Sequence, residues 1–415
     1  MESQSLHSTS TMKLLIPAIM AGNTCGYWLM GANNILTTQR LDPIVRPGRV
    51  GTHVHSVIGG SNFGFELTTD FLRESECTSI PIAEDKSNYW YPHLYFWWKN
   101  GSFTSVDGSP VICEDVHGYK RRTLLTQNAQ TTFTRMSQEQ QRLFLTICQA
   151  VTFLCLNFEG ESVRYNELPD HRCPNGIRAE INFPSCWDGE NIDSEDHKSH
   201  VAFLSTGPDN GTCLDPAYPV TLPRIFLEVY WYTQGFDDVR HEAMNFKQPF
   251  VFSNGDPTGY SYHSDFFNGW EPGVLQRALD ECNCNPFGDP ACCVERGIFS
   301  FDNSRRCYIT EAIFEPTLGT LDSLPGNNPV QEECYDEYPD TVIPPIMAPV
   351  YVHNGSNLAP SDTSTTLVPA RTLVTKERPR GTCIAGSSSL RQTTTKTLLS
   401  LIPSFWVIRL AFSLI

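Results

Sequence analysis

The chain has 415 residues, enough for two or three domains, and 46 acidic against 30 basic side chains give a net charge of −16. That charge repels phosphate backbones and anionic membrane surfaces, so we expect no nucleic-acid partner and membrane attachment only through a lipid anchor. Fifteen cysteines without a pair of Cys-x-x-Cys motifs indicate disulfides rather than a zinc ribbon. We therefore expect an extracellular protein.

The N-terminal 26 residues have the layout of a signal peptide preceded by a few upstream residues. Met12-Lys13 supplies a basic start, Leu14 to Ala21 is apolar, and small residues follow up to Gly26. From residue 27 no clear linker occurs before about residue 340. We expect a single secreted globular domain over residues 27–340.

The first potential ligands are His53 and His55, which are followed by Gly59-Gly60. A His-x-His pair on a strand places both rings on the same face, a geometry that suits a metal site, and the glycines permit a sharp turn. The alternative is a pair of surface histidines on an edge strand. Spacing alone leaves both interpretations open.

Residues 89–98 are aromatic on both faces of any strand, with His93 inside the run. Half of these rings must point into the core. The other half could cover a second core layer or form a platform on which sugar rings stack, and core packing is the simpler interpretation.

The following region predicts mainly strands. Alternating apolar residues over 151–158, 177–183 and 224–232 are typical of β-strands, whereas residues 137–148 and 272–282 have the pattern of short amphipathic helices. We predict a mainly β fold, with an antiparallel, sandwich-like core around residues 40–270, a few short helices and disulfides that staple it. Cysteines between Cys282 and Cys307 suggest a disulfide-bound cap.

A second group of potential ligands lies between Cys173 and Phe203. His197 and His200 are three residues apart beside Asp193 and Asp196, so one turn of chain would bring both imidazoles to one side. These groups could equally satisfy one another in a disulfide-stapled loop.

His263 and Asp265 complete the set, since residues two apart on an extended chain face the same way. We predict one pocket that binds zinc or copper, with Asp265 or Asp196 as a carboxylate ligand or catalytic base. The predicted metal ligands are His53, His55, His93, His197, His200 and His263.

The C-terminal part has the composition of a stalk and an anchor signal. Residues 341–385 are rich in Pro, Ser and Thr, as in an O-glycosylated stalk, and cannot bury enough apolar surface to fold. Small residues, a polar spacer and an apolar tail over residues 386–415 match a glycolipid-anchor signal. N-glycosylation sequons occur at Asn100, Asn210 and Asn354.

Five motifs together carry a resemblance to a known family over about residues 27–330. They are Asp-Pro-Ile-Val from residue 42, Gly-Gly-Ser-Asn-Phe from 59, Phe-Pro-Ser-Cys-Trp-Asp-Gly from 183, His-Lys-Ser-His from 197 and Gly-Asp-Pro-Thr-Gly-Tyr from 255. The chain resembles the secreted fungal family catalogued as domain of unknown function number one-nine-nine-six, whose members are often joined to WSC carbohydrate-binding domains. The resemblance implies a carbohydrate-rich cell-surface or cell-wall setting and no established activity. The chain departs from the family pattern between Cys113 and Gln149, where a misread splice junction would produce such a patch.

Three functions remain open. The first is a histidine-liganded metal enzyme that acts on cell-wall polysaccharide. The second is a non-catalytic wall glycoprotein or carbohydrate-binding module that presents the aromatic residues of 89–98 to glycan. The third, which ranks below the other two, is a metal-free glycoside hydrolase with Glu228 and Asp265 as candidate carboxylates, although nothing in their spacing favours this pair.

Overall fold

The computed structural model describes residues 27–115, 132–133, 150–282, 284, 288–331, 338, 343–356 and 366–367. The expected signal peptide, the expected helix at residues 137–148 and the anchor signal lie outside these residues and stay predictions. Within the described ranges, no helix is both long enough and apolar enough to cross a membrane.

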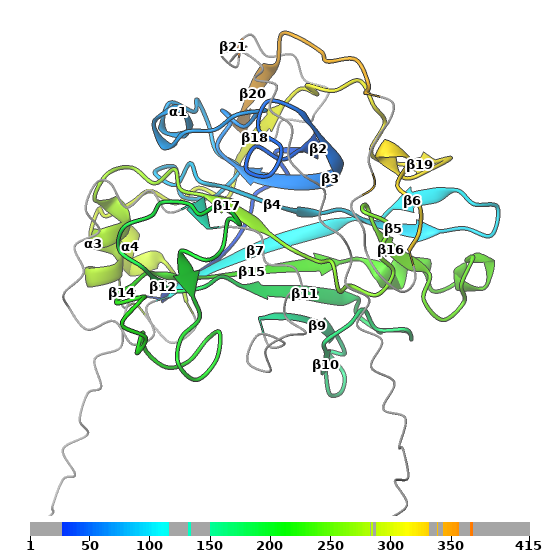
Figure 1. Cartoon of the computed structure of the whole chain (residues 1–415), viewed down its shortest axis with the longest axis horizontal. Helices are drawn as coiled ribbons and strands as arrows, with labels where there is room; N and C mark the ends of the chain where they lie inside the picture. The colour runs from blue at the N-terminus through cyan, green and yellow to red at the C-terminus, as the bar shows by residue number, and fades with distance from the viewer. Residues whose placement is uncertain are drawn as a thin grey trace, which may run out of the picture.

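Two large antiparallel sheets form the body of the molecule (Figure 1). The six-stranded sheet has the order β1 (Tyr27–Gly31), β7 (Gly108–Asp115), β15 (Arg224–Trp231), β11 (Ile177–Asn182), β9 (Val151–Cys155) and β10 (Val163–Tyr165). The five-stranded sheet has the order β2 (Thr37–Leu41), β3 (Val50–Gly59), β4 (Asn88–Pro92), β17 (Asp265–Phe267) and β8 (Thr132–Phe133). The predicted mainly β, antiparallel core is therefore confirmed.

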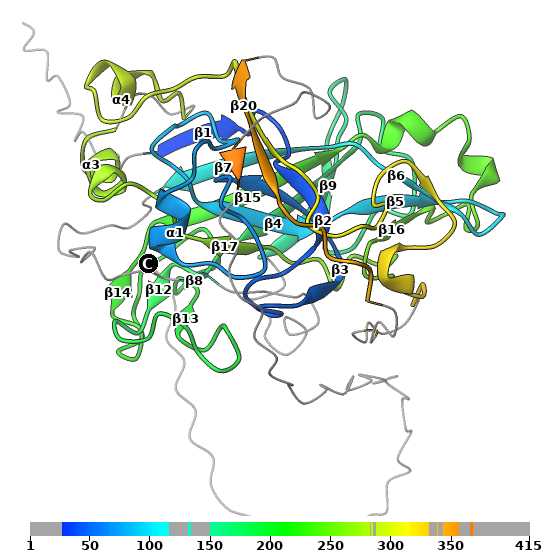
Figure 2. The same cartoon turned by 90° about the horizontal axis from the view of Figure 1, so that it is seen from above.

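Smaller elements surround these sheets (Figure 2). A four-stranded sheet contains β16 (Phe250–Phe252), β5 (Leu94–Trp97), β6 (Phe103–Ser105) and β19 (Thr320–Leu321). Two three-stranded sheets contain β13 (Val201–Ala202), β12 (Cys186–Trp187) and β14 (Val220–Thr221), and β18 (Arg305–Ile309), β20 (Tyr351–Ser356) and β21 (Thr366–Leu367). The described helices are short: α1 (Thr69–Arg73), α3 (Val274–Glu281), α4 (Ala291–Glu295) and the 3-10 turns η2 (Thr233–Phe236), η3 (Arg240–Glu242) and η4 (Pro325–Asn327).

The two faces of the five-stranded sheet contact different cores. Ile58, Tyr89 and Tyr91 pack with residues of the six-stranded sheet in the larger core, whereas Val57 and Trp90 belong to a second core. Because side chains alternate along a strand, every second residue of β3 and β4 faces away from the six-stranded sheet. This alternation decides on which side of the sheet each histidine lies.

Glycine is required where β3 ends. Gly59 has a φ of +116°, and a Cβ built on it would lie 1.7 Å from the carbonyl oxygen of Ser87. No side chain fits this close approach of two backbones, and L-residues rarely adopt such a φ. The Gly-Gly motif after the His-x-His pair therefore ends the strand against the segment that leads into β4.

Five disulfides are formed among the described cysteines: Cys77–Cys307, Cys155–Cys173, Cys186–Cys213, Cys282–Cys293 and Cys284–Cys292. The last two lie in the segment that contains α3 and α4 and match the expected cap. Cys77–Cys307 joins positions 230 residues apart and brings β18 to the second core. The predicted disulfide-stapled fold is confirmed.

The folded body extends beyond residue 340. Strand β20 pairs with β18 over five residue pairs, from Arg305–Ser356 to Ile309–Val352. Val352 is buried in the second core, with 1% of its surface exposed. Residues 343–356, which the sequence assigns to the stalk, are thus joined to the fold through β20 and Val352, whereas Ile343, Ile346 and Met347 stay exposed.

Candidate metal centre

Strand β3 places His53 and His55 on the face that points away from the six-stranded sheet. The pairing of β2 with β3 shifts its register between Gln39 and Leu41, which marks an irregularity of the bulge kind. Bulges redirect side chains and are common beside functional sites. The carbonyl oxygen of Leu41 lies 3.0 Å from Nδ1 of His55.

A tightly bonded loop before β17 places His263. The buried carboxylate of Asp256 accepts hydrogen bonds from the backbone nitrogens of Thr258, Gly259 and Ser261 and from the hydroxyls of Thr258 and Ser261. Ser261 in turn offers its carbonyl oxygen 2.8 Å from Nδ1 of His263. The Gly-Asp-Pro-Thr-Gly-Tyr motif therefore forms a turn that orients the His263 ring towards His55, although the two histidines are 208 residues apart in the sequence.

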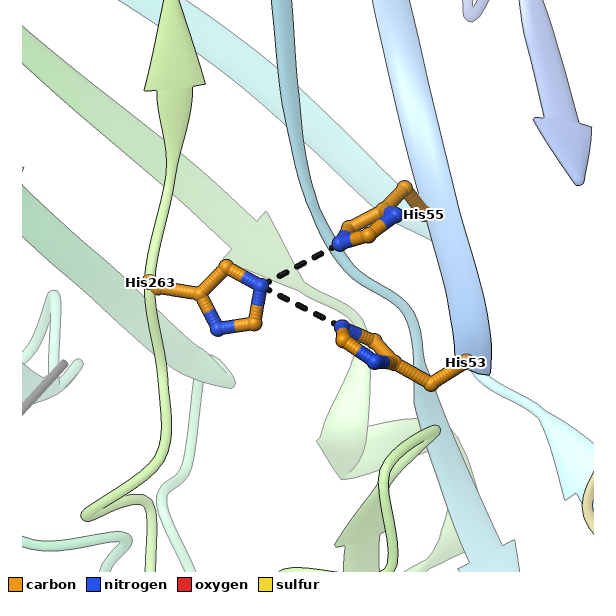
Figure 3. Close-up of side chains that lie close together, drawn as sticks. All are labelled: His53, His55 and His263. Atoms are coloured by element: carbon orange, nitrogen blue, oxygen red, sulfur yellow. Dashed lines mark hydrogen bonds between the residues drawn. The ribbon is translucent and has the colours of Figure 1, made fainter. Parts of the chain in front are cut away.

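The three imidazoles meet through their Nε2 atoms (Figure 3). Nε2 of His263 lies 3.2 Å from Nε2 of His53 and 3.1 Å from Nε2 of His55. The three side chains are 0–1% exposed. Two nitrogen ligands at about 2.0–2.1 Å from a tetrahedral zinc ion lie about 3.3 Å apart, so the observed spacing fits a shared metal ion.

The hydrogen bonds at Nδ1 set the protonation of two rings. A backbone carbonyl only accepts, so Nδ1 of His55 and Nδ1 of His263 must donate to Leu41 and Ser261. In the neutral rings both Nε2 atoms then carry lone pairs, and two lone pairs cannot hydrogen-bond to each other. A proton or a metal ion held between the two rings would satisfy both lone pairs at this spacing of 3.1 Å.

Two carboxylates extend this group. Asp42, His55 and Asp265 offer ligand atoms within 4.8 Å of one another, and all three are buried. Asp265 pairs with Trp90 on β4, so its side chain lies on the same face of the sheet as those of Trp90, Val57 and His55. We call His53, His55, His263, Asp42 and Asp265 the histidine centre.

The model of the domain of unknown function DUF1996 matches residues 42–270, more than half of the chain. The chain belongs to the DUF1996 family. The match begins at Asp42 and includes every member of the histidine centre, which confirms the resemblance described from the sequence. Neither the search of curated proteins nor the search of solved structures gave a match.

His93 of the DUF1996 domain lies on the opposite side of the sheet. Its Nδ1 is 2.8 Å from Oγ of Ser56, which alternates with His55 along β3, and its ring contacts Trp231 of the six-stranded sheet at 5.4 Å between centroids. Burial lowers the pKa of His93 to about 3. This histidine is a neutral core residue and not a neighbour of His53.

His197 and His200 belong to the loop between β12 and β13. Nδ1 of His197 lies 2.9 Å from both carboxylate oxygens of Asp193, and Nδ1 of His200 lies 2.9 Å from Oγ of Ser194. Figures 1 and 2 both place this small sheet away from β3. The DUF1996 structure thus brings together three of the six predicted histidines.

Asp196 forms hydrogen bonds within the same loop between β12 and β13. Partial burial favours its neutral form, but hydrogen bonds from the backbone of Ser199 and Lys198 and from Ser194 lower its pKa below the usual value. These bonds hold a turn. Among the described residues, no group of three potential ligand atoms within 4.8 Å includes Asp196, His197, His200 or His93.

Two other groups in the described chain consist mainly of disulfide sulphurs: Cys155, His171 and Cys173, and Cys284, Cys292 and Cys293. A metal binds the thiolate form of cysteine, and a disulfide sulphur is not a thiolate. Neither group is a metal site in the oxidised protein.

Glu228 and Asp265 of the DUF1996 domain do not face a common cleft. Glu228 alternates with Leu227 and Val229, which point into the larger core, so its side chain faces outwards from the six-stranded sheet. Arg178 bridges it to Glu180. Asp265 faces away on the other sheet, and stacked sheets are about 10 Å apart, so the two carboxylates are not arranged as a glycosidase pair.

The three sequon asparagines, Asn100, Asn210 and Asn354, are exposed. Asn100 lies in the loop between β5 and β6, where its Oδ1 accepts hydrogen bonds from the backbone nitrogen and hydroxyl of Ser102. An exposed turn is accessible to a modifying enzyme. Glycosylation of the three sites stays a prediction.

Asp42, which lies beside His55, and Asp256, whose loop positions His263, are functional residues that the histidine pattern of the sequence does not indicate. Both lie inside motifs that the family resemblance quotes, Asp-Pro-Ile-Val and Gly-Asp-Pro-Thr-Gly-Tyr. The signal that marks them is an acidic residue directly before proline in a turn. Their roles depend on contacts with residues far away in sequence, which spacing does not reveal.

Proposed function

We propose that this protein is an extracellular metalloprotein in which His53, His55 and His263 bind one transition-metal ion. The observation that carries the proposal is the convergence of three Nε2 atoms, two of them on rings whose Nδ1 donates to a backbone carbonyl. Metal-binding imidazoles usually pass their other N–H to such an acceptor. Zinc and copper are the ions that imidazole ligands suit best.

The donor set supports a catalytic role more than a structural one. Structural zinc sites are mostly closed by four protein ligands rich in cysteine, whereas three histidines leave a position for water or substrate. A buried carboxylate beside such a position can accept a proton, and Asp265 and Asp42 lie within 4.8 Å of a ring nitrogen of His55. We assign these two residues the role of proton acceptor or additional ligand.

Burial limits what can react at the metal. Because the three histidine side chains are 0–1% exposed, a polymer cannot touch an ion at this centre in this conformation. Action on cell-wall polysaccharide, one of the functions left open by the sequence, would then require that glycan bind beside the centre. The extracellular setting is supported by the five disulfides.

The test is the metal content of the secreted full-length protein, measured by plasma mass spectrometry after growth with zinc and copper. We expect about one ion per chain, because three ligands converge on one point. Replacing His53 and His55 together with alanine should reduce the content by at least tenfold, with circular dichroism unchanged.

The matched control replaces His197 and His200 together with alanine. These two rings bond within their own loop, so this variant should keep the full metal content. Loss of metal in the control variant, or full metal content in the His53→Ala, His55→Ala variant, would exclude the proposed centre.

A further inference from the structure

A hollow of about 200 Å³ opens on the surface beside the four-stranded sheet. It is lined by Trp97, Asn245, Gln248, Pro257 and Thr258. Trp97 is the last residue of β5, Gln248 precedes β16, and Pro257 and Thr258 belong to the Asp256 loop. The hollow is smaller than the roughly 300–1,000 Å³ of sites that bind drug-sized ligands, so it is suited to a single small ring.

Hydrogen bonds and stacking hold the walls of the hollow. The ring of Trp97 stacks on Phe103 with 4° between the planes and 6.1 Å between centroids. Nε2 of Gln248 donates to the carbonyls of Leu168 and Pro169, and its Oε1 accepts from the backbone nitrogen of Phe250. Because these side chains are already held in place, binding of a ligand would cost little conformational entropy of the site.

The bonding of Asn245 and Thr258 fixes the polar part of the wall. Oδ1 of Asn245 accepts from the backbone nitrogens of Lys247 and Gln248, so its amide nitrogen is turned away from that turn. The Thr258 hydroxyl donates to Asp256 and accepts from the backbone nitrogen of Tyr260, so its oxygen keeps one further lone pair for a ligand. The wall thus carries an amide donor and a hydroxyl acceptor at defined positions.

The side chains that line the hollow indicate which class of ligand it can bind. None of the five residues is ionisable in the physiological range, so the hollow offers no counter-charge to a phosphate, a carboxylate or an ammonium group. It combines the indole of Trp97, a ring that can contact apolar C–H surface, with amide and hydroxyl groups, which hydrogen-bond to hydroxyls. We propose that this hollow binds one neutral sugar ring of a glycan chain.

The proposal does not depend on the metal. The hollow and the histidine centre share the Asp256 loop, since Thr258 lines the hollow and the same loop ends at His263. A glycan held by Trp97 would therefore lie against the segment that positions one of the metal ligands. Binding of glycan should nevertheless persist in protein whose metal has been removed with a chelator, and this separates the two proposals.

The experiment is isothermal titration of the full secreted chain with laminarihexaose and cellohexaose, two neutral glucose hexamers, and with hexagalacturonate as a charged counterpart. We expect binding of at least one neutral hexamer and at least tenfold weaker binding of hexagalacturonate. Trp97→Ala should weaken the neutral ligand at least tenfold, whereas Phe158→Ala, which removes a ring that is 74% exposed on another loop, should not.

A second variant tests the hollow independently, in case Trp97→Ala fails to fold. Asn245→Trp adds bulk at the exposed rim of the hollow and leaves Trp97 itself unchanged, and it should cause the same loss. The proposal is overturned if neither neutral hexamer binds at millimolar concentration, if the loss is the same in Phe158→Ala, or if chelation of the metal abolishes binding.

Discussion

At the scale of single residues, His55 and His93 differ in what surrounds their rings. His55 donates to a backbone carbonyl and presents its Nε2 to another imidazole, which suits it to a cation. His93 lies among aromatic rings, 5.1 Å from Tyr95 and 5.4 Å from Trp231, and burial lowers its pKa to about 3. The same residue type, directly after the neighbouring strand, is thus a proposed metal ligand in one place and a packing residue in the other.

The pKa of His93 predicts a pH dependence of stability. Because the folded pKa of about 3 lies below the usual value of 6.5, the unfolded state binds the proton more tightly between these values. The free energy of unfolding should therefore fall as the pH falls from about 6.5 towards 3, by at most about 1.4 kcal/mol per pH unit from this group.

Urea denaturation of His93→Gln and of the unchanged protein at several pH values measures this contribution. The variant should lose less stability on acidification than the unchanged protein, since glutamine does not titrate and can still bond to Ser56. Parallel pH profiles for the two proteins would show that His93 does not carry the effect. His171→Gln, at an exposed histidine, is the matched control.

At the scale of elements, the Asp256 loop is the part that positions His263. One buried carboxylate accepts five hydrogen bonds from three residues of the loop, and the loop then presents the Ser261 carbonyl to Nδ1 of His263. Asn at position 256 would turn one acceptor oxygen into a donor facing N–H or O–H groups. The loop would then shift, and with it the acceptor that orients the ring.

Asp256→Asn should therefore weaken metal affinity by about tenfold or more, as changes to partners of metal ligands commonly do. A competition titration against a coloured chelator, run well below the melting temperature, measures this without interference from unfolding. Asp209→Asn, at an exposed loop position, should leave the affinity unchanged. An unchanged affinity in Asp256→Asn would mean that the loop supports the fold but not the centre.

The strands also explain which of the six proposed histidine ligands could be placed from the sequence. The period of two along a strand places His53 and His55 on one face whatever the partner strands are, and the same rule joins His263 to Asp265. It could not place His93, because this ring follows Tyr89 and Tyr91 in the alternation of β4, and only the register of β4 against β3 shows that these residues face away from His55. The spacing of His197 and His200 reflects the local hydrogen bonds of their own loop.

At the scale of the whole molecule, alternation and turn residues predicted a mainly β, antiparallel, disulfide-stapled fold. They did not predict that residues 343–356 return to pair with β18, because a Pro-rich segment resembles a stalk until the surface it covers is known. Strand β20 and the Cys77–Cys307 disulfide close the second core, on the side of the sheet that carries the histidine centre. The C-terminal segment thus belongs to the domain that encloses the proposed metal.

The central claim is that one metal ion lies between His53, His55 and His263, and anomalous diffraction tests it most directly. Crystals of the secreted protein, measured at the absorption edges of zinc and copper, should give one strong anomalous peak about 2.0–2.1 Å from the three Nε2 atoms. A peak at His197 and His200 instead, or no peak in crystals grown with both metals, would contradict the account.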